Sequence, residues 1–474
     1  MSEKLDVIIF GASGFTGKYT VFEATSVLQN VRWGVAGRSR PKLENVLKDI
    51  GRKANKNLSA IPIIIADIEN ESSLQEMAKR CKVLVNCCGP YRFYGEAVVK
   101  ACIESGTHHV DVSGEPQYME SMQLKYNQLA KEKNVYVVSA CGFDSIPADM
   151  GTVFIEKNFD GVVNSVETFL HSYTKGGSGG ACLHYGTWES AIYSLAHSDE
   201  LRNLRRQLYS ERLPKFYPVL KNRPLLFKSD IIKGICLPFP GSDRSVVMRS
   251  QRFMYEQEKK RPVQMQAYVV FKSWMTALIV ALLGVAFGIM TKFALGRRLL
   301  LKYPKVFSLG LVSHDGPKEK DMEATEFSFT MKALGWPQTE RLAEVSDQYT
   351  NPPSKSLMVK ISGTNPGYGA TCVAVLCAAL TILKESDKMP TTGGVLPPGA
   401  AFAKTSLIAE LEKYEHVSTV FSLSKSAESS NRSISASSSF TAKVRSLSSN
   451  SNSAILLLIC LDVLGFSSSI TLQK

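Results

Sequence analysis

The feature that most constrains this chain is a short apolar run that leads straight into a glycine-rich turn. Residues 6–20 read DVIIFGASGFTGKYT, so the run VIIF is followed by Gly11, Gly14 and Gly17. A continuous apolar run is typical of a strand buried inside a parallel sheet. Glycines directly after such a strand allow a tight turn into a helix, whose free backbone N–H groups can bind a pyrophosphate. The opening therefore predicts a dinucleotide-binding site.

The rest of the first 150 residues alternates between apolar strands and helices. Strand-like runs occupy 32–40, 61–67, 82–90, 108–114 and the start of 135–151, and helices are expected at 41–50, 72–80, 95–105 and 116–133. Strands that alternate with helices indicate a doubly wound parallel sheet. We therefore expect an α/β protein in which residues 1–150 form a Rossmann-like dinucleotide-binding domain.

The predicted cofactor site collects residues from the carboxyl ends of these strands. In NAD-selective folds an acidic residue ends the second strand and binds the ribose 2′-hydroxyl, whereas an arginine there suits a 2′-phosphate. This chain has Arg38, so NADP(H) is favoured over NAD(H). Asp67 ends the third strand and is expected near the adenosine. The full set of expected cofactor-binding residues is Gly11, Ser13, Gly14, Phe15, Thr16, Gly17, Arg38, Ser39, Asp67, Cys88, Gly89 and Pro90.

A catalytic side chain is harder to find. Hydride transfer needs mainly positioning, with one acid to protonate the product. Asp111 and Asp144 are the candidates we retain, although Asp144 also suits a helix cap or a turn. The seven histidines and ten cysteines lack ligand spacing, so no metal site is expected.

Two motifs of other enzymes are present but lack their usual context. Tyr-x-x-x-Lys, the acid motif of short-chain dehydrogenases, starts at Tyr217, Tyr255 and Tyr268, all far beyond the nucleotide-binding half. We interpret all three as chance. The stretch GGSGG at 176–180 fits G-x-S-x-G, yet four glycines in five residues favour a loop over a ligand rather than a nucleophile elbow.

A basic segment surrounds one long apolar stretch. Residues 201–305 contain 21 Lys or Arg against five Asp or Glu, and residues 274–290 contain no charge. This stretch is near the lower limit for a membrane span. It could span, enter one leaflet as a hairpin around Gly284 and Gly288, or pack as a buried helix. Cations flank this stretch on both sides, and Trp274 lies at one boundary. These features favour a phospholipid surface over nucleic acid as the binding partner of the basic segment.

Several motifs together resemble one family, the saccharopine dehydrogenase-like oxidoreductases. They are GASGFTG, AGR, NCCGPYRFYGEAVVKACIESGTHHVDVSGE, GFDSIPADMG, GTNPGYGATCVAVLCAAL and TGGVLPPGAAF, spread over roughly residues 4–413. The resemblance implies a nucleotide-binding domain, a mixed-sheet second domain and a C-terminal segment that returns to the first. It also implies lipid-droplet association, since the family includes a lipid-droplet protein and lipid-modifying reductases.

The expected organisation follows from these observations. An α+β domain at 151–390 would bind substrate and carry the apolar, membrane-associating segment 272–300; a return segment would span 391–413. Residues 414–474 depart from the family pattern, and 422–453 contain 15 serines, so this tail is expected to be disordered.

The function expected is hydride transfer between NADP(H) and a lipid-like or membrane-proximal substrate, in lipid or glycolipid metabolism. A saccharopine-type amino-acid reductase and a non-catalytic nucleotide-binding scaffold on lipid droplets remain alternatives. The expected location is the cytoplasmic face of a membrane or lipid droplet, because the N-terminus lacks the apolar region of a signal peptide. A homodimer is left open.

Overall fold

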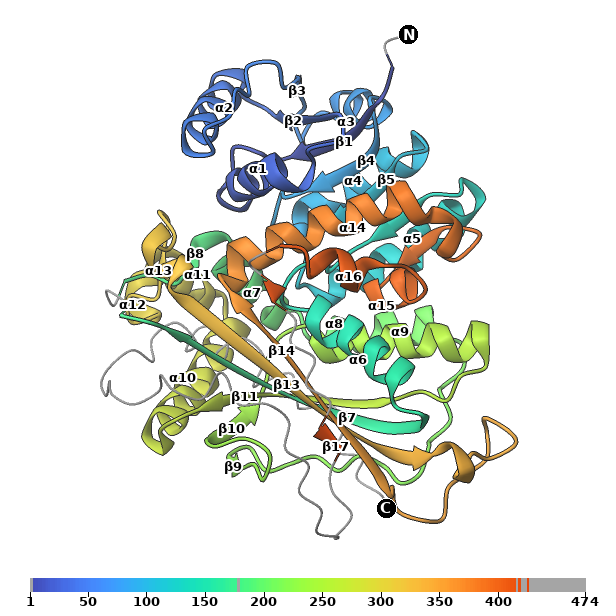
Figure 1. Ribbon diagram of the computed structural model, residues 1–474. Helices are drawn as coiled ribbons and strands as arrows, with labels where there is room; N and C mark the ends of the chain where they lie inside the picture. The colour runs from blue at the N-terminus through green and yellow to red at the C-terminus, as the bar shows by residue number, and fades with distance from the viewer. Residues whose placement is uncertain (1–2, 177–179, 415–416, 419–423, 426–474) are drawn as a thin grey trace, which may run out of the picture.

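The apolar runs of the first third of the chain form one parallel sheet in the computed structural model, which describes residues 3–176, 180–414, 417–418 and 424–425. The strand order is β15-β6-β5-β4-β1-β2-β3 (Figure 1). The chain runs from β1 outward to β3 and then restarts beside β1 at β4, so the carboxyl ends of β1 and β4 meet at a switch point where ligands bind. The strands are β1 (Leu5–Phe10), β2 (Trp33–Gly37), β3 (Ile63–Ile65), β4 (Cys81–Asn86), β5 (His108–Asp111), β6 (Tyr136–Val138) and β15 (Gly394–Leu396).

Helices cover both faces of this sheet, as an all-parallel sheet requires. One face carries α1, α2 and α14, and the other carries α3, α4 and α5. The predicted doubly wound fold is therefore confirmed. Helix α4 begins at Tyr91 rather than at residue 95, because Pro90 caps it and its fixed φ suits entry into a helix. The bounds are α1 (Phe15–Val27), α2 (Arg40–Lys53), α3 (Glu71–Lys79), α4 (Tyr91–Glu104), α5 (Pro116–Glu132) and α14 (Thr371–Glu385).

A second, mixed sheet of eight strands lies beside the first (Figure 1). Its order is β16-β14-β13-β7-β11-β10-β9, with β17 also paired to β14. Helices α6 (Ile146–Asn158) and α9 (Asp243–Glu258) pack against it. Buried residues alternate along β14, so one face of this sheet is covered. The strands are β7 (Gly161–Thr174), β9 (Phe227–Lys228), β10 (Ile235–Pro238), β11 (Gln264–Phe271), β13 (Thr325–Pro337), β14 (Lys355–Thr364), β16 (Val417–Ser418) and β17 (Ser424–Lys425).

A group of short helices lies at the left of Figure 1, around a two-stranded parallel pair. The pair joins β8 (Leu183–His184) to β12 (Val312–Ser313). Its helices are α7 (Tyr185–Ala196), α10 (Trp274–Lys292), α11 (Ala294–Lys302), α12 (Pro304–Phe307) and α13 (Glu319–Glu323), while α8 (Glu200–Leu208) packs against α5.

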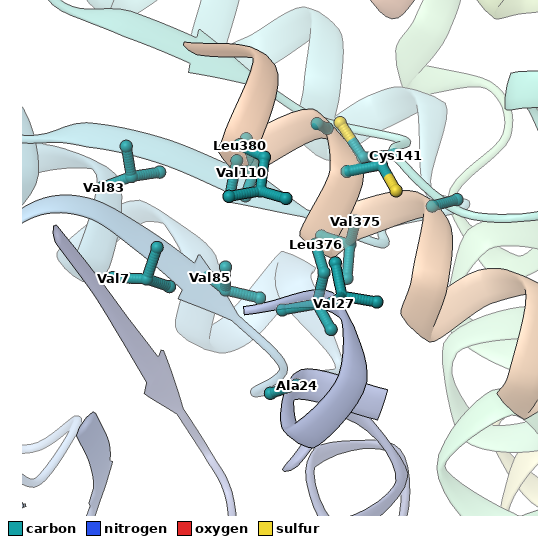
Figure 2. Packing of buried hydrophobic residues seen from close by; sticks show 14 of the residues in the cluster. Val7, Ala24, Val27, Val83, Val85, Val110, Cys141, Val375, Leu376 and Leu380 are labelled. Atoms are coloured by element: carbon teal, nitrogen blue, oxygen red, sulfur yellow. The ribbon is translucent and has the colours of Figure 1, made fainter. Parts of the chain in front are cut away.

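The chain returns to the first sheet after β14. A π-helical turn (Pro366–Ala370) leads into α14, which packs on α1, β4 and β5, and β15 then pairs with β6. Figure 2 shows Val375, Leu376 and Leu380 of α14 against valines of the strands. The return therefore starts before residue 391, within the range expected for the second domain. Two short helices follow, α15 (Pro398–Phe402) and α16 (Leu407–Leu411).

Two short pieces of the expected tail are paired strands. Both β16 and β17 pair with β14, whose edge presents unpaired backbone groups to any nearby strand. The remainder of 415–474, including most of the serine-rich stretch, lies outside the described residues.

Among the described residues, two helices are long and apolar enough to cross a membrane. They are α10, with mean hydropathy 2.1, and Pro366–Lys388, with mean hydropathy 1.7. Helix α10 continues without a break through Gly284 and Gly288, so the hairpin alternative is wrong. A glycine inside a helix costs only about 1 kcal/mol, which flanking residues easily offset.

Candidate functional site

A cavity of about 1040 Å³ opens where the carboxyl ends of the first sheet face the second half of the chain. One wall comes from the turns after β1 to β5. The other comes from β7, β8, α7, α13 and the π-helical turn. A cavity at the switch point of a parallel sheet is where a dinucleotide binds.

The glycine turn has the geometry that a dinucleotide requires. Gly11 has φ +79°, and a Cβ there would lie 2.6 Å from Cys88 Sγ. A Cβ on Gly17 would lie 2.1 Å from the Gly11 carbonyl oxygen, so glycine lets α1 pack on the turn. Gly14 caps α1 without a side chain, which leaves the first-turn amides open to an anion.

Most residues of the glycine turn line the cavity, and one instead lets α1 pack on the turn. Its members from this turn are Gly11, Ser13, Gly14, Phe15 and Thr16, while Gly17 serves packing and does not reach the cavity. The phosphate-binding residues expected from sequence are therefore brought together around one open helix N-terminus, and the site fits a pyrophosphate.

Arg38 lies at the end of β2, exposed and facing the cavity. It is the only lysine or arginine among the described residues that line the cavity. No carboxylate occupies its place, so the site fits a 2′-phosphate. Ser39 caps α2 and does not line the cavity.

The other expected cofactor residues fall on neighbouring turns. Asp67, in the turn after β3, lines the cavity, and its carboxylate accepts a hydrogen bond from the Glu69 backbone amide at 3.2 Å. Cys88 and Gly89 line the cavity after β4, and Pro90 lies just outside it. Burial raises the pKa of the Cys88 thiol, so this side chain is neutral and contributes shape.

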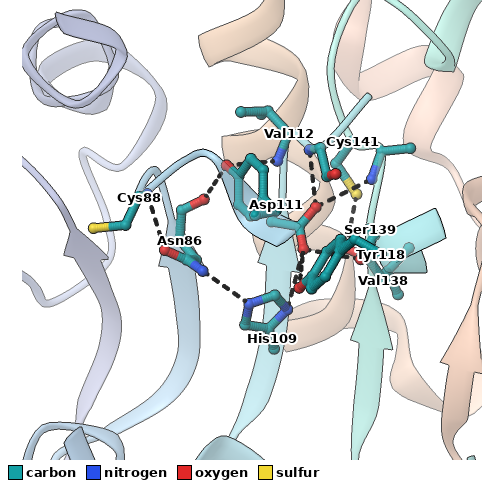
Figure 3. Close-up of polar contacts among 12 residues, drawn as sticks. Asn86, Cys88, His109, Asp111, Val112, Tyr118, Val138, Ser139 and Cys141 are labelled. Atoms are coloured by element: carbon teal, nitrogen blue, oxygen red, sulfur yellow. Dashed lines mark hydrogen bonds and ion pairs between the residues drawn. The ribbon is translucent and has the colours of Figure 1, made fainter. Parts of the chain in front are cut away.

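Asp111 is buried beneath the cavity and does not line it. Its carboxylate accepts the Ser139 hydroxyl at 2.8 Å, the Tyr118 hydroxyl at 3.0 Å and the Ser113 amide at 3.0 Å (Figure 3). Burial raises its pKa to about 6, against the opposing effect of these donors. It also accepts the amide of Ala140, a cavity residue with φ +62°. Asp111 therefore holds a strained edge of the cavity in place.

Asp144 does line the cavity, in the turn before α6. One carboxylate oxygen accepts the Ser242 hydroxyl at 3.1 Å, and the other is buried without a hydrogen-bond partner among the described residues. Burial raises its pKa to about 6. A Cβ on Gly241 would lie 2.2 Å from this carboxylate, so a bare glycine makes room for it. The helix cap is Ser145, not Asp144.

Sequence reasoning missed most of the second wall. One face of α7 presents Thr187, Ser190, Ala191 and Ser194 to the cavity. The stretch GTWESAIYSLA at 186–196 is typical of a helix with Thr187 and Ser190 near its start, and helical spacing from Ser190 places Ser194 on the same face. Glu115 links the two walls: its carboxylate accepts hydrogen bonds from the amides of Tyr91 and Arg92 at the N-terminus of α4, and it also bonds to Ser190 of α7. None of the three Tyr-x-x-x-Lys tyrosines lines the cavity.

A doubly wound sheet with such a turn and such a cavity defines the class of dinucleotide-dependent oxidoreductases. Comparisons with known proteins narrow the class. Residues 7–138 match the family model described as the saccharopine dehydrogenase NADP binding domain. The chain is 41% identical to a human saccharopine dehydrogenase-like oxidoreductase, over 86% of this chain and 95% of that protein. It therefore belongs to the family of saccharopine dehydrogenase-like oxidoreductases, and it is an oxidoreductase that binds NADP(H).

Two further comparisons bear on fold and setting. A Caenorhabditis elegans protein named lipid droplet localized protein is 38% identical over 87% of this chain and 97% of its own length. Apo saccharopine dehydrogenase (L-Glu forming) from Saccharomyces cerevisiae matches with a TM-score of 0.50, covering 89% of this chain and 100% of that one. At 14% identity, this likeness shows a shared fold alone. The predicted family, fold class and cofactor are confirmed.

Proposed function

We propose that this chain uses NADPH to reduce a carbonyl or conjugated alkene in an uncharged, lipid-like substrate at a membrane or lipid-droplet surface. The observation that carries the proposal is the charge of the cavity lining. Apart from Arg38, at the adenosine end, the described lining has no lysine or arginine. The gap at 177–179 is Gly-Ser-Gly in sequence and adds no cation.

The same observation argues against an amino-acid reductase. A substrate with several carboxylates needs arginine or lysine partners, because a buried unpaired carboxylate is costly. The described lining instead contributes carboxylates of its own, Glu115 and Asp144, together with Phe143, Leu183 and Met322. A neutral, largely apolar substrate suits these surroundings.

Bound NADPH would supply the hydride. The turn at Gly11 to Thr16 would hold the pyrophosphate, Arg38 the 2′-phosphate and Asp67 the adenosine side. Asp111 would act through the backbone of Ala140 as a positioning residue, because its oxygens are occupied by neighbouring donors.

Asp144 is our proposed source of the proton that completes the reduction. Its buried, unpartnered oxygen and its pKa of about 6 keep a share of this carboxyl protonated near neutral pH. Ser242 fixes the other oxygen, so the protonated one can be held toward the cavity.

The test of function is NADPH oxidation with (E)-2-hexadecenal, which offers both a carbonyl and a conjugated alkene. We expect oxidation with this aldehyde and no reduction of NADP⁺ with saccharopine. Arg38→Ala should raise the KM for NADPH while leaving the KM for NADH unchanged. Arg40→Ala is the matched control, since Arg40 is exposed two residues away and does not line the cavity. Turnover of saccharopine by the wild type would overturn the proposal.

Asp144→Asn tests the proton source through a pH profile. Because the acid form donates, the wild-type rate should fall as the pH rises above about 6. The variant should lose about a hundredfold or more in kcat and lose this pH step, with NADPH binding retained. A variant with the wild-type profile would show that the proton comes from another group.

A further inference from the structure

Helix α7 has two faces with different neighbours. Thr187, Ser190 and Ser194 line the cavity, together with Ala191. Trp188, Ile192 and Leu195 face the opposite way and belong to a hydrophobic cluster with Phe287 of α10 and Leu300 of α11. One helix thus forms a wall shared by the cavity and the α10–α11 pair.

The contacts across this wall are close. The Trp188 indole N–H donates to the Leu300 carbonyl at 2.9 Å, and its ring centroid lies 4.7 Å from that of Phe287. Just before α7, Leu183 pairs with Val312, so the chain leaving α12 is joined to the edge of the cavity. It then contributes Met322 of α13 to the lining.

Helix α10 is bound to the protein by one face only. The buried face holds Ala277, Val280, Ala281, Gly284, Phe287, Gly288 and Thr291. The opposite face exposes large apolar side chains at helical spacing: Met275 (70%), Ile279 (45%), Leu282 (61%), Val285 (37%) and Ile289 (54%). Because α10 packs along one side on α7, α11 and β10, its exposed apolar face suits a helix that lies in the plane of a lipid surface.

The apolar face continues onto the next helices and is surrounded by positive charge. Phe293, Leu295, Val306 and Leu309 are 62–69% exposed. No aspartate or glutamate occurs from residue 259 to residue 314. The cations along the apolar helices are Lys272, Lys292, Arg297, Arg298, Lys302 and Lys305. Lys292 pairs with Asp199 at 3.2 Å. An apolar face bordered by this excess of cations is complementary to a phospholipid leaflet that contains anionic headgroups.

We propose that the α10–α12 surface docks flat on such a leaflet and that a long-chain, uncharged substrate passes directly from the leaflet into the cavity beside α7. This inference rests on the proposed function and adds the route by which the substrate arrives. The buried cluster around Trp188 fills the space between α10 and α7. The acyl chain would therefore pass at the edge of this wall, where Leu183 pairs with Val312 and Met322 joins the cavity lining.

The experiment compares two aldehydes that differ in chain length. (E)-2-hexadecenal is presented in phosphatidylcholine–phosphatidylserine vesicles, and water-soluble (E)-2-hexenal is presented without vesicles. The double variant Leu282→Asp/Ile289→Asp removes two apolar anchors and should weaken vesicle binding about a hundredfold or more. We expect the double variant to oxidise NADPH more slowly with the vesicle-borne aldehyde, in proportion to its lost vesicle binding. Its rate with hexenal should match that of the wild type. Val219→Asp, at a 49% exposed apolar residue outside these helices, is the control and should change neither rate.

The outcomes separate the route from the reaction. A double variant that fails to bind vesicles but oxidises NADPH with vesicle-borne hexadecenal at the wild-type rate would overturn the route. A wild type that is inactive with both aldehydes would instead overturn the proposed function. Photolabelling with a diazirine-bearing hexadecenal in the same vesicles tests the route without turnover. Label within 181–194 and 317–322 is expected, and label confined to 274–309 would overturn the proposal.

Discussion

Helices α10 and α14 are both strongly apolar, but they lie in different surroundings. Helix α10 and the helical stretch Pro366–Lys388, which contains α14, both meet the length and hydropathy expected of a membrane span. Every residue of α14 from Cys372 to Ile382 is buried, between the first sheet and helices α1 and α16 (Figure 2). By contrast, α10 buries one face and leaves the other apolar and exposed.

This difference shows that hydropathy alone does not distinguish a core helix from a helix with an exposed apolar face. A helix on a parallel sheet must be apolar on more than one side when further helices cover it, as α1 and α16 cover α14. The charge in the surrounding sequence is more informative, because residues 259–314, which contain α10 and α11, include no aspartate or glutamate, whereas α14 ends in Lys384 and Glu385.

The largest effect is expected from an aspartate placed in each helix. Leu376→Asp puts a charge at a fully buried position of α14 and should cost about 4 kcal/mol or more of unfolding free energy. Leu282→Asp, at a 61% exposed position of α10, should leave the melting temperature nearly unchanged. Thermal unfolding followed by circular dichroism measures both. Equal destabilisation would show that α10 is covered in the folded protein.

A smaller and more local effect is expected from Trp188→Ala. Truncating this buried ring removes the packing of α7 against Phe287 of α10 and should cost about 3 kcal/mol. Amide hydrogen exchange should accelerate in residues 274–292 and stay slow in 371–385, because α14 belongs to a different hydrophobic cluster. Uniform acceleration in both helices would contradict this separation.

The smallest effect per residue is expected from the cations beside α10. Replacing Arg298, Lys302 and Lys305 by glutamine should weaken binding to phosphatidylserine-containing vesicles by about 1 kcal/mol per residue, and raised salt should reduce the difference. Lys384→Gln at the end of α14 is the control and should have no effect. Co-sedimentation with vesicles at two salt concentrations measures this binding. If Lys384→Gln weakened binding as much as the triple variant, the cations beside α10 would have no special role in vesicle binding.

Much of the cofactor site was predictable, and most of the substrate wall was not. The turn from Gly11 to Gly17 and the arginine after β2 can be identified because each motif is contiguous with its strand. Sequence retained both Asp111, at the end of a predicted strand, and Asp144, in the turn after the next strand, as candidate acids. They differ in the structure because Ser139 and Tyr118 fold over Asp111, whereas glycines leave Asp144 open to the cavity.

The sequence by itself determined the dinucleotide turn, the doubly wound sheet and the NADP(H) preference. These depend on residues that are neighbours along the chain, where local steric and hydrogen-bonding rules apply. Only the tertiary structure decided that α14 is a core helix, that α10 buries one face and exposes the other, and that α7 separates this exposed face from the cavity. The physical reason is that burial and charge environment depend on partners distant in sequence: Trp188 meets Leu300, and Asp144 meets Ser242.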